Sequence, residues 1–325
     1  MFMTKFVARR SVEIVITLFI IATLTFALFR LMPSDPVGLM VHPLWTPEMK
    51  QKQRELWGLD KSYTEQYTIF MKNMLRGEFG TSFYLQTDVY DLIKERLPPT
   101  ILLFSSSTIL SFSLGMYIGR IIAWRRGGKL EYGSTVVGMI LYSVPTFWVG
   151  LMAIWIFSYR LDLFPIGGIK SVAVWGVPDA GVLAKALDIG HHLFLPLTVE
   201  VLLFFPGIML MMKNVMLETL EEDYVITARA KGLPEKVVRD HHAARNVMLP
   251  MVTVFTLSLV FSFSGSIIVE NVFNWPGLGA MFLGATIGYD YPIAQGAFII
   301  MSAVLLIAIL ISEILYAYLD PRVRY

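Results

Sequence analysis

A few polar side chains lie within long apolar stretches of this sequence, where their type and spacing could carry chemistry. Glu200 is one, and Ser258, Ser262 and Ser266 recur every fourth residue, which would place three hydroxyls on one face of a helix. Ionisable residues in such stretches are costly to bury and often line a path for a solute or ion. Our functional hypothesis is that these four residues line a translocation path. The structural alternatives are a carboxyl satisfied by hydroxyls or water, and serines that allow close helix packing.

Patterns for nucleotide hydrolysis, metal binding and covalent catalysis are missing from the sequence. It has no cysteine, which excludes disulfides, thiolate metal sites and cysteine nucleophiles. The Gly-Gly-Lys within residues 126–131 lacks the spacing and the hydroxyl residue of a phosphate-binding loop. The adjacent pairs His191–His192 and His241–His242 would point about 100° apart on a helix, unlike i, i+4 pairs that share an ion. We therefore predict no catalytic residue, no metal site and no cofactor in this chain.

The composition is that of an integral membrane protein. Of 325 residues, 55% are hydrophobic and only 16% are charged, with a mean hydropathy of +0.61. Soluble globular domains are about 45–50% apolar and about 25% charged. The net charge of +2 is too small to suggest nucleic acid as a partner. Membrane lipid is therefore the expected surrounding of this chain.

Six apolar stretches are long enough to cross a membrane, which needs roughly 20 residues at about 1.5 Å of rise each. They are Val12–Phe29, Thr100–Gly119, Thr135–Phe157, His192–Met212, Pro250–Val269 and Ala294–Ser312. Residues 271–289 carry no charge and are a candidate seventh span, but four glycines and Pro276 weaken a regular helix there. We predict that they form an outer loop that packs back on the bundle. The predicted fold is an all-α integral membrane protein with six transmembrane helices.

The basic residues fall mainly on one side of these six stretches. Fifteen of the 27 lysines and arginines lie before the first stretch or after the second, fourth and sixth. The two later loops on the other side hold only Arg160, Lys170 and Lys185. By the positive-inside rule, both termini face the cytoplasm. We predict a multi-pass protein of the cell (inner, cytoplasmic) membrane.

The segment between the first two apolar stretches is rich in aromatic residues and carries helix signals. Thr46 followed by Pro47 is typical of an N-cap and a first helical position, and a second helix signal follows Gly58. We predict a small helical subdomain outside the membrane, the alternative being a solvated linker. The predicted divisions are residues 1–31 (cytoplasmic N-terminus and first span), 32–98 (outer helical subdomain) and 99–325 (core membrane domain).

A polar stretch at about 214–249 separates the fourth and fifth apolar stretches. Apolar residues from Leu217 to Ala228 recur at spacings of 3, 4 and 4, which predicts a narrow stripe on a helix with an acidic start and a basic end. Gly232 is placed to end that helix, and a second helix is predicted to run from Pro234 toward Pro250. Such a pair could lie on the lipid surface, serve as a solvated connection, or dock a cytoplasmic partner.

The stretch "EDYVITARAKGL" followed by "ARNVMLP" resembles the cytoplasmic EAA loop of ABC-transporter permeases, in the subclass that imports dipeptides and oligopeptides. The resemblance covers nearly the whole chain. Further matches, in order, are "ARRSVEIVITLFIIATLTFALFRLMPSDP", "LWGLDKSYTEQYTIFMKNMLRGEFGTSF", "ERLPPTILL", "YSVPTFWVGLM", "NWPGLGAMFLGA" with "DYPIAQG", and "DPRVRY". The chain departs from the general pattern where Ile226-Thr227-Ala228 replaces Glu-Ala-Ala, and Leu249-Pro250 lies further from the glycine.

The resemblance implies partners for this chain. They are a second homologous permease subunit, one or two cytoplasmic ABC ATPase subunits that bind ATP and Mg, and an extracytoplasmic solute-binding protein. It also implies that the polar loop inserts into a cleft of an ATPase subunit, where small residues allow close approach and basic ones pair with carboxylates. The residues expected to dock there are Glu222, Asp223, Tyr224, Thr227, Ala228, Arg229, Ala230, Lys231, Gly232 and Leu233.

An ion-gradient-driven secondary transporter is the alternative hypothesis. Such transporters often have helices that are broken at matching places in two halves, and Pro145, Pro196 and Pro206 give this hypothesis weak support. The docking-type loop favours the ATP-driven permease. The solute is open among peptides, sugars, nickel and other small molecules.

Overall fold

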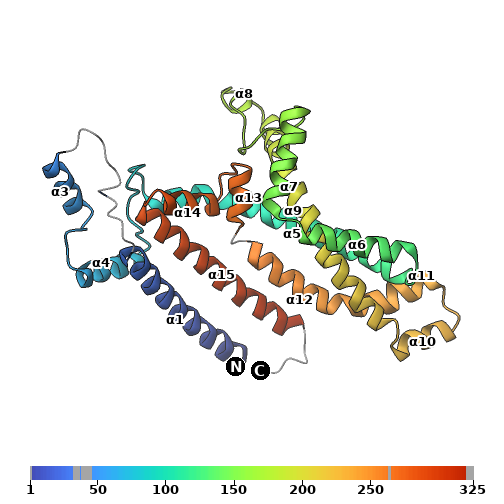
Figure 1. Ribbon diagram of the computed structural model, residues 1–325. Helices are drawn as coiled ribbons and strands as arrows, with labels where there is room; N and C mark the ends of the chain where they lie inside the picture. The colour runs from blue at the N-terminus through green and yellow to red at the C-terminus, as the bar shows by residue number, and fades with distance from the viewer. Residues whose placement is uncertain (1, 32–36, 38–45, 263–264, 320–325) are drawn as a thin grey trace. The chain divides into compact units, whose positions relative to one another are not determined.

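The computed structural model describes residues 2–31, 37, 46–262 and 265–319, and these form helices joined by loops and turns (Figure 1). In this part of the chain the only extended pairing is a bridge between Thr81 and Asp88. The all-α prediction is therefore confirmed. The elements, of which η1 and η2 are π-helical, are α1 (Phe2–Leu31), α3 (Pro47–Leu56), α4 (Tyr63–Leu75), α5 (Val89–Trp124), α6 (Lys129–Ser143), α7 (Thr146–Ala153), η1 (Ile154–Arg160), α8 (Val172–Trp175), α9 (Val182–Thr219), α10 (Asp223–Ala230), α11 (Glu235–Val237), η2 (Val238–Ala243), α12 (Ala244–Ser262), α13 (Ile267–Val272), α14 (Leu278–Ile287) and α15 (Tyr291–Leu319).

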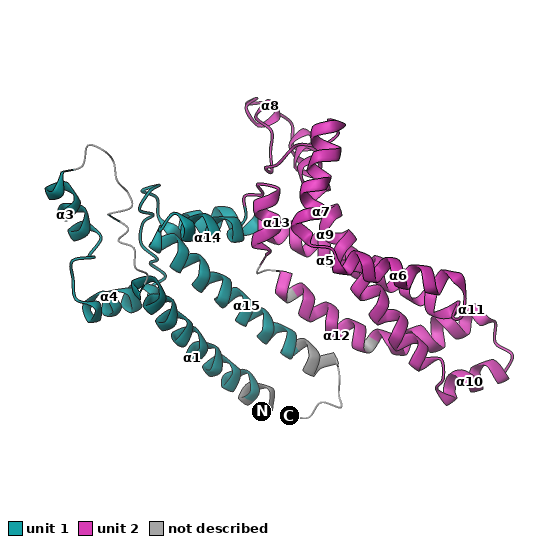
Figure 2. Cartoon of the chain, in the orientation of Figure 1, with its two compact units in different colours: residues 1–98, 277–314 teal, residues 99–276, 315–325 magenta. Residues whose placement is uncertain are grey.

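The chain divides into two compact units, which Figure 2 shows in different colours. Unit 1 holds residues 1–98 and 277–314, and unit 2 holds residues 99–276 and 315–325. The end of the chain is thus shared, whereas the sequence places all of residues 99–325 in one domain. The reason lies in a buried cluster of unit 1, in which Leu278 and Ala294 pack with Phe29 and Val89.

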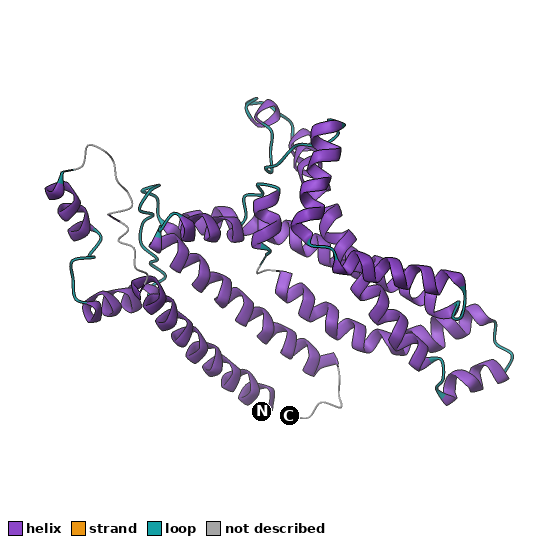
Figure 3. Ribbon diagram, viewed as in Figure 1, coloured by secondary structure: helices purple, strands orange, loops and turns teal. Residues whose placement is uncertain are grey.

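Among the described residues, four helices are long and apolar enough to cross a membrane. Figure 3 shows the helices of the chain in a different colour from the loops. The apolar segments are Phe6–Leu31, Val89–Trp124, Val182–Thr219 and Tyr291–Ile314. The first, second, fourth and sixth predicted spans lie within them. Because α5 begins at Val89, the last residues of the predicted outer subdomain belong to the same helix as the second span. α9 continues through Pro196 and Pro206.

The third predicted span, Thr135–Phe157, consists of two segments. α6 ends at Ser143, and the segment Thr146–Arg160 follows at an angle of 93°. Pro145 has no N–H to donate and disfavours helical geometry at Val144, which has φ −77° and ψ 133°. The prediction of one regular helix is therefore wrong here, and the pair is either a broken span or a re-entrant segment.

The fifth predicted span, Pro250–Val269, is also interrupted. α12 begins earlier, at Ala244, and ends at Ser262, and a separate helix, α13, follows. Gly265 has φ +69°, a left-handed conformation that favours glycine, and a Cβ there would lie 2.8 Å from Thr100 Cγ2. The prediction of a continuous helix to Val269 is wrong. Residues 263–264 lie outside the described residues.

Helices α3 and α4 lie in the segment that was predicted to form an outer subdomain. Thr46 caps α3 by accepting a hydrogen bond from the Met49 N–H at 3.3 Å, and Pro47 takes the first helical position. Ser62 caps α4 through the Glu65 N–H, also at 3.3 Å. The helix signals were therefore read correctly. Residues 32–36 and 38–45 of this segment lie outside the described residues.

The uncharged stretch 271–289 contains α14, which has ten residues. At about 1.5 Å per residue this helix is about 15 Å long, too short to cross the hydrocarbon. Its residues Leu278 and Ala285 are buried in the same cluster as Val89 and Tyr291. α14 therefore packs within unit 1, and no seventh span forms from these described residues.

Within unit 2, α5 approaches α9 through two glycines one helical turn apart. A Cβ on Gly115 would lie 2.7 Å from Ile208 Cβ, and one on Gly119 would lie 2.6 Å from the Met209 carbonyl oxygen. Small residues at this spacing let helices in a membrane approach closely. This contact holds α5 and α9 close together, and both candidate sites described below include residues of these two helices.

Candidate functional site

The polar loop between α9 and α12 folds as a short helix, α10, followed by a sharp turn. α10 follows α9 after a turn at residues 220–222, so the predicted stripe from Leu217 to Ala228 is divided between two helices. Asp223 lies in the first turn of α10 and Arg229 in the last. That order of charges is favourable with the helix dipole, as the sequence predicts.

The turn after α10 is built around glycine. Gly232 has φ +73°, and its N–H donates to the Arg229 carbonyl at 2.9 Å. The predicted helix-ending role of Gly232 is therefore confirmed. Pro234 precedes α11, as predicted, and the helical segment runs through η2 into α12, past Pro250. Apart from its two chain neighbours, no described residue has an atom within 4 Å of a Cβ placed on Gly232, so the turn faces open space.

Most of the residues predicted to dock a partner are exposed. They are Glu222, Asp223, Tyr224, Thr227, Arg229, Ala230, Lys231 and Gly232, and Leu233 is half-buried. Ala228, in contrast, is only 4% exposed, so the prediction that it offers room to a partner is wrong. The reason is that α10 buries Val225 and Ala228, three residues apart on one face of the helix.

Ile226 is a candidate docking residue that the sequence prediction omitted. Its side chain is 54% exposed, and Tyr224 on the same helix is 38% exposed. Exposed apolar side chains that gather on one element are typical of surfaces that another protein or a membrane covers. We call Tyr224, Ile226, Thr227, Ala230, Lys231 and Gly232 the docking face. The signal for Ile226 was its place at the first position of the EAA pattern.

The inward face of the loop is anchored on the ends of three long helices. Val225 and Ala228 pack in one buried cluster that draws residues from α5, α9, η2 and α12. Close-packed interiors transmit strain because their atoms have little free space. Val225 and Ala228 therefore join α10 to the same packed cluster as these helices. The partners of Val225 and Ala228 in the cluster include Ala123, Met212, Met216, Val238 and Val247.

Arg229 is held by contacts within the chain. Its Nε lies 3.6 Å from Glu235 Oε1, and its guanidinium lies 5.3 Å from the ring centroid of Trp124. A partner carboxylate would therefore have to share or displace these contacts. Lys231 is exposed and makes no ion pair among the described residues, so it is the better placed of the two basic residues to meet a partner.

Asp240 links the second half of the loop to α5. Arg239 donates two hydrogen bonds to its carboxylate, at 2.8 and 2.9 Å, and Arg120 Nη1 lies 3.8 Å from Asp240 Oδ1. The hydrogen bonds from Arg239 lower the pKa of the Asp240 carboxyl, with burial acting in the opposite direction. The charged form of Asp240 is therefore favoured in the folded chain.

A cavity of about 450 Å³ within unit 2 is lined by residues of α5, α7, α9 and α12 and by the start of α13. Glu200, Ser258, Ser262 and Ser266 all line it, together with Thr108 and other residues of these helices. The structure thus brings together the four residues predicted to line a path. The sequence predicted that all three serines share one helix face, and this is wrong for Ser266, which lies outside α12. It caps α13 by accepting a hydrogen bond from the Val269 N–H at 3.4 Å.

Comparison with known proteins gives matches along nearly the whole chain. The family model described as the binding-protein-dependent transport system inner membrane component matches residues 115–325, and the model of its N-terminal part matches residues 3–104. An oligopeptide transport system permease protein of Bacillus subtilis is 35% identical over 324 residues, covering 99% of this chain and 100% of that protein. A dipeptide transport system permease protein of Lactococcus lactis is 34% identical over 324 residues, with the same coverage. Its counterpart in Escherichia coli is 32% identical over 342 residues, covering 99% of both chains.

Proposed function

The chain belongs to the family of inner membrane components of binding-protein-dependent transport systems, and on that premise we propose that it is a permease subunit of an ATP-driven importer in the cell membrane. In this proposal a second homologous permease completes the path, and an extracytoplasmic binding protein delivers the solute. Separate cytoplasmic ATPase subunits bind ATP and Mg. The names of the relatives, which are oligopeptide and dipeptide permeases, support a peptide or a related small solute.

The observation that carries the proposal is the construction of α10. One face of this eight-residue helix is exposed and the other is buried among the ends of α5, α9 and α12. In the proposal the docking face inserts into a cleft of an ATPase subunit. Movement of that subunit, driven by ATP, displaces α10, and the buried cluster passes the displacement to the three long helices. The spans then open the path toward one side of the membrane or the other.

The cavity in unit 2 is the proposed part of the path in this subunit. Glu200 is a half-buried carboxylate on its wall, and Ser258 and Ser262 add hydroxyls that can replace water around a solute. We expect Glu200→Gln to lower solute uptake while the ATPase subunits stay bound. The matched control is Glu218→Gln, near the cytoplasmic end of the same helix. Equal uptake by both variants and the wild type would remove Glu200 from the path.

The source of energy tests the function as a whole. A tagged chain purified from native membranes should bring an ABC ATPase with it, and labelled peptide uptake should stop when cells are depleted of ATP. An ionophore that collapses ion gradients, at constant ATP, should leave the uptake intact. Uptake that survives ATP depletion but stops with the ionophore would contradict the proposal and support the secondary transporter.

A further inference from the structure

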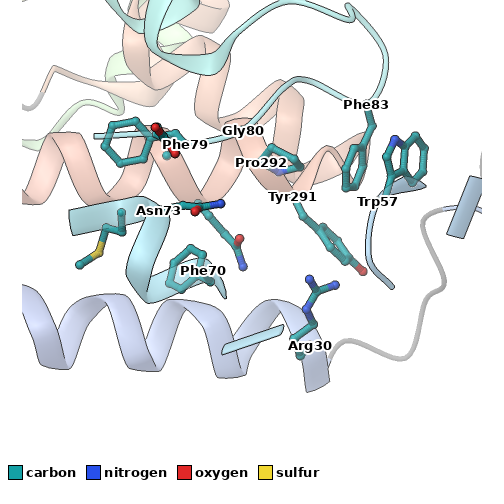
Figure 4. Close-up of a pocket in the computed structure, with 13 residues that line it drawn as sticks. Arg30, Trp57, Phe70, Asn73, Phe79, Gly80, Phe83, Tyr291 and Pro292 are labelled. Carbon is teal, nitrogen blue, oxygen red and sulfur yellow. The ribbon is translucent and has the colours of Figure 1, made fainter. Parts of the chain in front are cut away.

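A second pocket, separate from the cavity in unit 2, lies wholly within unit 1. Its volume is about 130 Å³, and it is bounded by the end of α1, the residue after α3, α4, the loop at residues 78–83 and the start of α15. Figure 4 shows Arg30, Trp57, Phe83 and Tyr291 around it. A single water needs about 10–15 Å³ of such space, so the pocket is large enough for a small organic molecule.

Two buried nitrogen atoms at this pocket have no hydrogen-bond partner among the described residues. They are Nε of Arg30 and Nε2 of Gln295, and the Gln295 residue is only 7% exposed. Buried donors normally have a hydrogen-bond partner, because burial removes their hydrogen bonds to water, and without a replacement this costs free energy. Two such donors on the wall of one pocket indicate an acceptor that occupies it.

The charge of Arg30 favours a negatively charged acceptor. Its guanidinium lies 5.5 Å from the ring centroid of Phe26 and 5.9 Å from that of Tyr291, and no described carboxylate forms an ion pair with it. Glu78 is the acidic residue of the pocket wall, and it is exposed, so water screens its charge. A guanidinium with its planar set of donors matches the two oxygens of a carboxylate.

The remaining walls are flat and aromatic. The rings of Trp57 and Phe83 are stacked with centroids 3.9 Å apart and planes 13° apart, and Phe83 lies 6.3 Å from the Tyr291 ring. The loop carrying Phe83 is fixed by Asp290, whose carboxylate accepts hydrogen bonds from Ser82 Oγ at 2.6 Å and from the Phe83 N–H at 3.2 Å. These walls are therefore preorganised to cover an apolar group.

We propose that this pocket binds a small organic acid. The Arg30 guanidinium and the Gln295 carboxamide donate to its carboxylate, and the aromatic side chains cover its apolar body. The inference does not rest on the proposed function, because it uses only contacts within unit 1 and assigns this pocket no place in the transport path.

The test uses the full-length chain in lipid nanodiscs and fluorine NMR of 4-fluorobenzoate, a method suited to weak ligands. We expect saturable binding that is at least tenfold tighter than that of 4-fluorobenzamide, which has the same shape without the charge. Gln295→Met keeps the size of the side chain and removes the unpaired donor. This variant should bind the acid at least tenfold more weakly, with a Tm no lower than that of the wild type. Arg30→Gln should show the same loss of binding.

The matched control is Gln51→Met, an exposed glutamine on α3 outside the pocket, which should bind as the wild type does. Partition of the probe into lipid is the same for all variants, so this comparison separates it from binding in the pocket. Equal affinity for acid and amide, or no saturable binding, would mean that only water occupies the pocket and would overturn the proposal. A lowered Tm in Gln295→Met, or unchanged binding by it, would overturn it as well.

Discussion

At the scale of single residues, Gly232 combines a left-handed backbone conformation with an exposed position. Its φ of +73° costs a β-branched residue about 1–2 kcal/mol, and its surroundings in the chain leave room for a side chain. We therefore expect Gly232→Val to insert in the membrane and pair with its partner permease, but to lose peptide uptake or release the ATPase. Uptake and ATPase occupancy, measured on the same membranes, check this expectation.

Gly232→Asn separates strain from bulk at the same position. Asparagine tolerates the left-handed conformation far better than valine does, so it adds a side chain with little strain. Loss of uptake in both variants would assign the effect to bulk at the contact, and loss in valine alone would assign it to the turn. Full uptake by Gly232→Val at wild-type ATPase occupancy would contradict the coupling role of this loop.

Asp240 gives a prediction about pH. Because hydrogen bonds from Arg239 lower its pKa in the folded state, the ionised carboxylate adds stability at pH values above the unfolded pKa, near 3.9. That contribution is lost as the pH falls through the lower, folded pKa. We expect Asp240→Asn to lower the Tm in detergent at pH 7, and the difference from the wild type to shrink below about pH 4. Asp179→Asn, at an exposed aspartate without an ion pair among the described residues, is the control. A difference that stays constant with pH would contradict the assignment.

At the scale of elements, we expect substitutions of two glycines to shift the Tm in opposite directions, because only one of them lies in the α5–α9 contact. Gly119→Ala places a methyl group 2.6 Å from the Met209 carbonyl oxygen, which forces the helices apart. Overpacking of this kind costs about 1–3 kcal/mol, so the Tm should fall. Gly133→Ala, on the exposed face of α6 with nothing within 4 Å, should raise the Tm slightly through helix propensity. Equal shifts for the two variants would show that this contact is looser than described.

The sequence predicts elements well where one local signal decides them. Thr46 with Pro47, and Gly232 with Pro234, each placed a helix end correctly because a cap or a left-handed turn depends on a few neighbouring residues. The breaks at Pro145 and Gly265 were missed, because apolar residues continue on both sides and hydropathy averages over the break. The glycine pair of α5 that approaches α9 was also missed, although the spacing Gly-x-x-x-Gly is a signal for close approach.

The candidate sites were predicted less evenly than the helices. Glu200 and Ser258 could be proposed together from their chemistry, but their meeting in one cavity depends on how α9 and α12 pack, which the sequence does not encode locally. The inward orientation of Ala228 depends on the break between α9 and α10, which shifts the phase of the helix. The pocket of unit 1 joins Arg30 to Gln295, residues far apart in the sequence, and no local pattern connects them.

At the scale of the whole molecule, the remaining prediction is topological. The charge distribution predicts six spans with both termini in the cytoplasm, with residue 60 outside and residue 230 inside. The chain has no cysteine, so Asp60→Cys and Ala230→Cys each introduce a single reactive thiol. An impermeant maleimide should label the first in intact cells and the second only in inverted vesicles. Labelling of both from the same face would refute this topology.

The two faces of α10 also bear on how such proteins could exchange partners. Val225 and Ala228 pack against the interior of this chain, whereas Ile226, Thr227 and Ala230 are exposed and would contact another protein. A chimera that imports the outward residues of a related loop, and keeps the two inward ones, should accept the ATPase of the donor without refolding its host. Grafting the whole helix would bring a foreign inward pair as well, and the host spans would have to repack around it. On this expectation, compatibility between subunits depends on the outward positions of an eight-residue helix and not on its two buried positions.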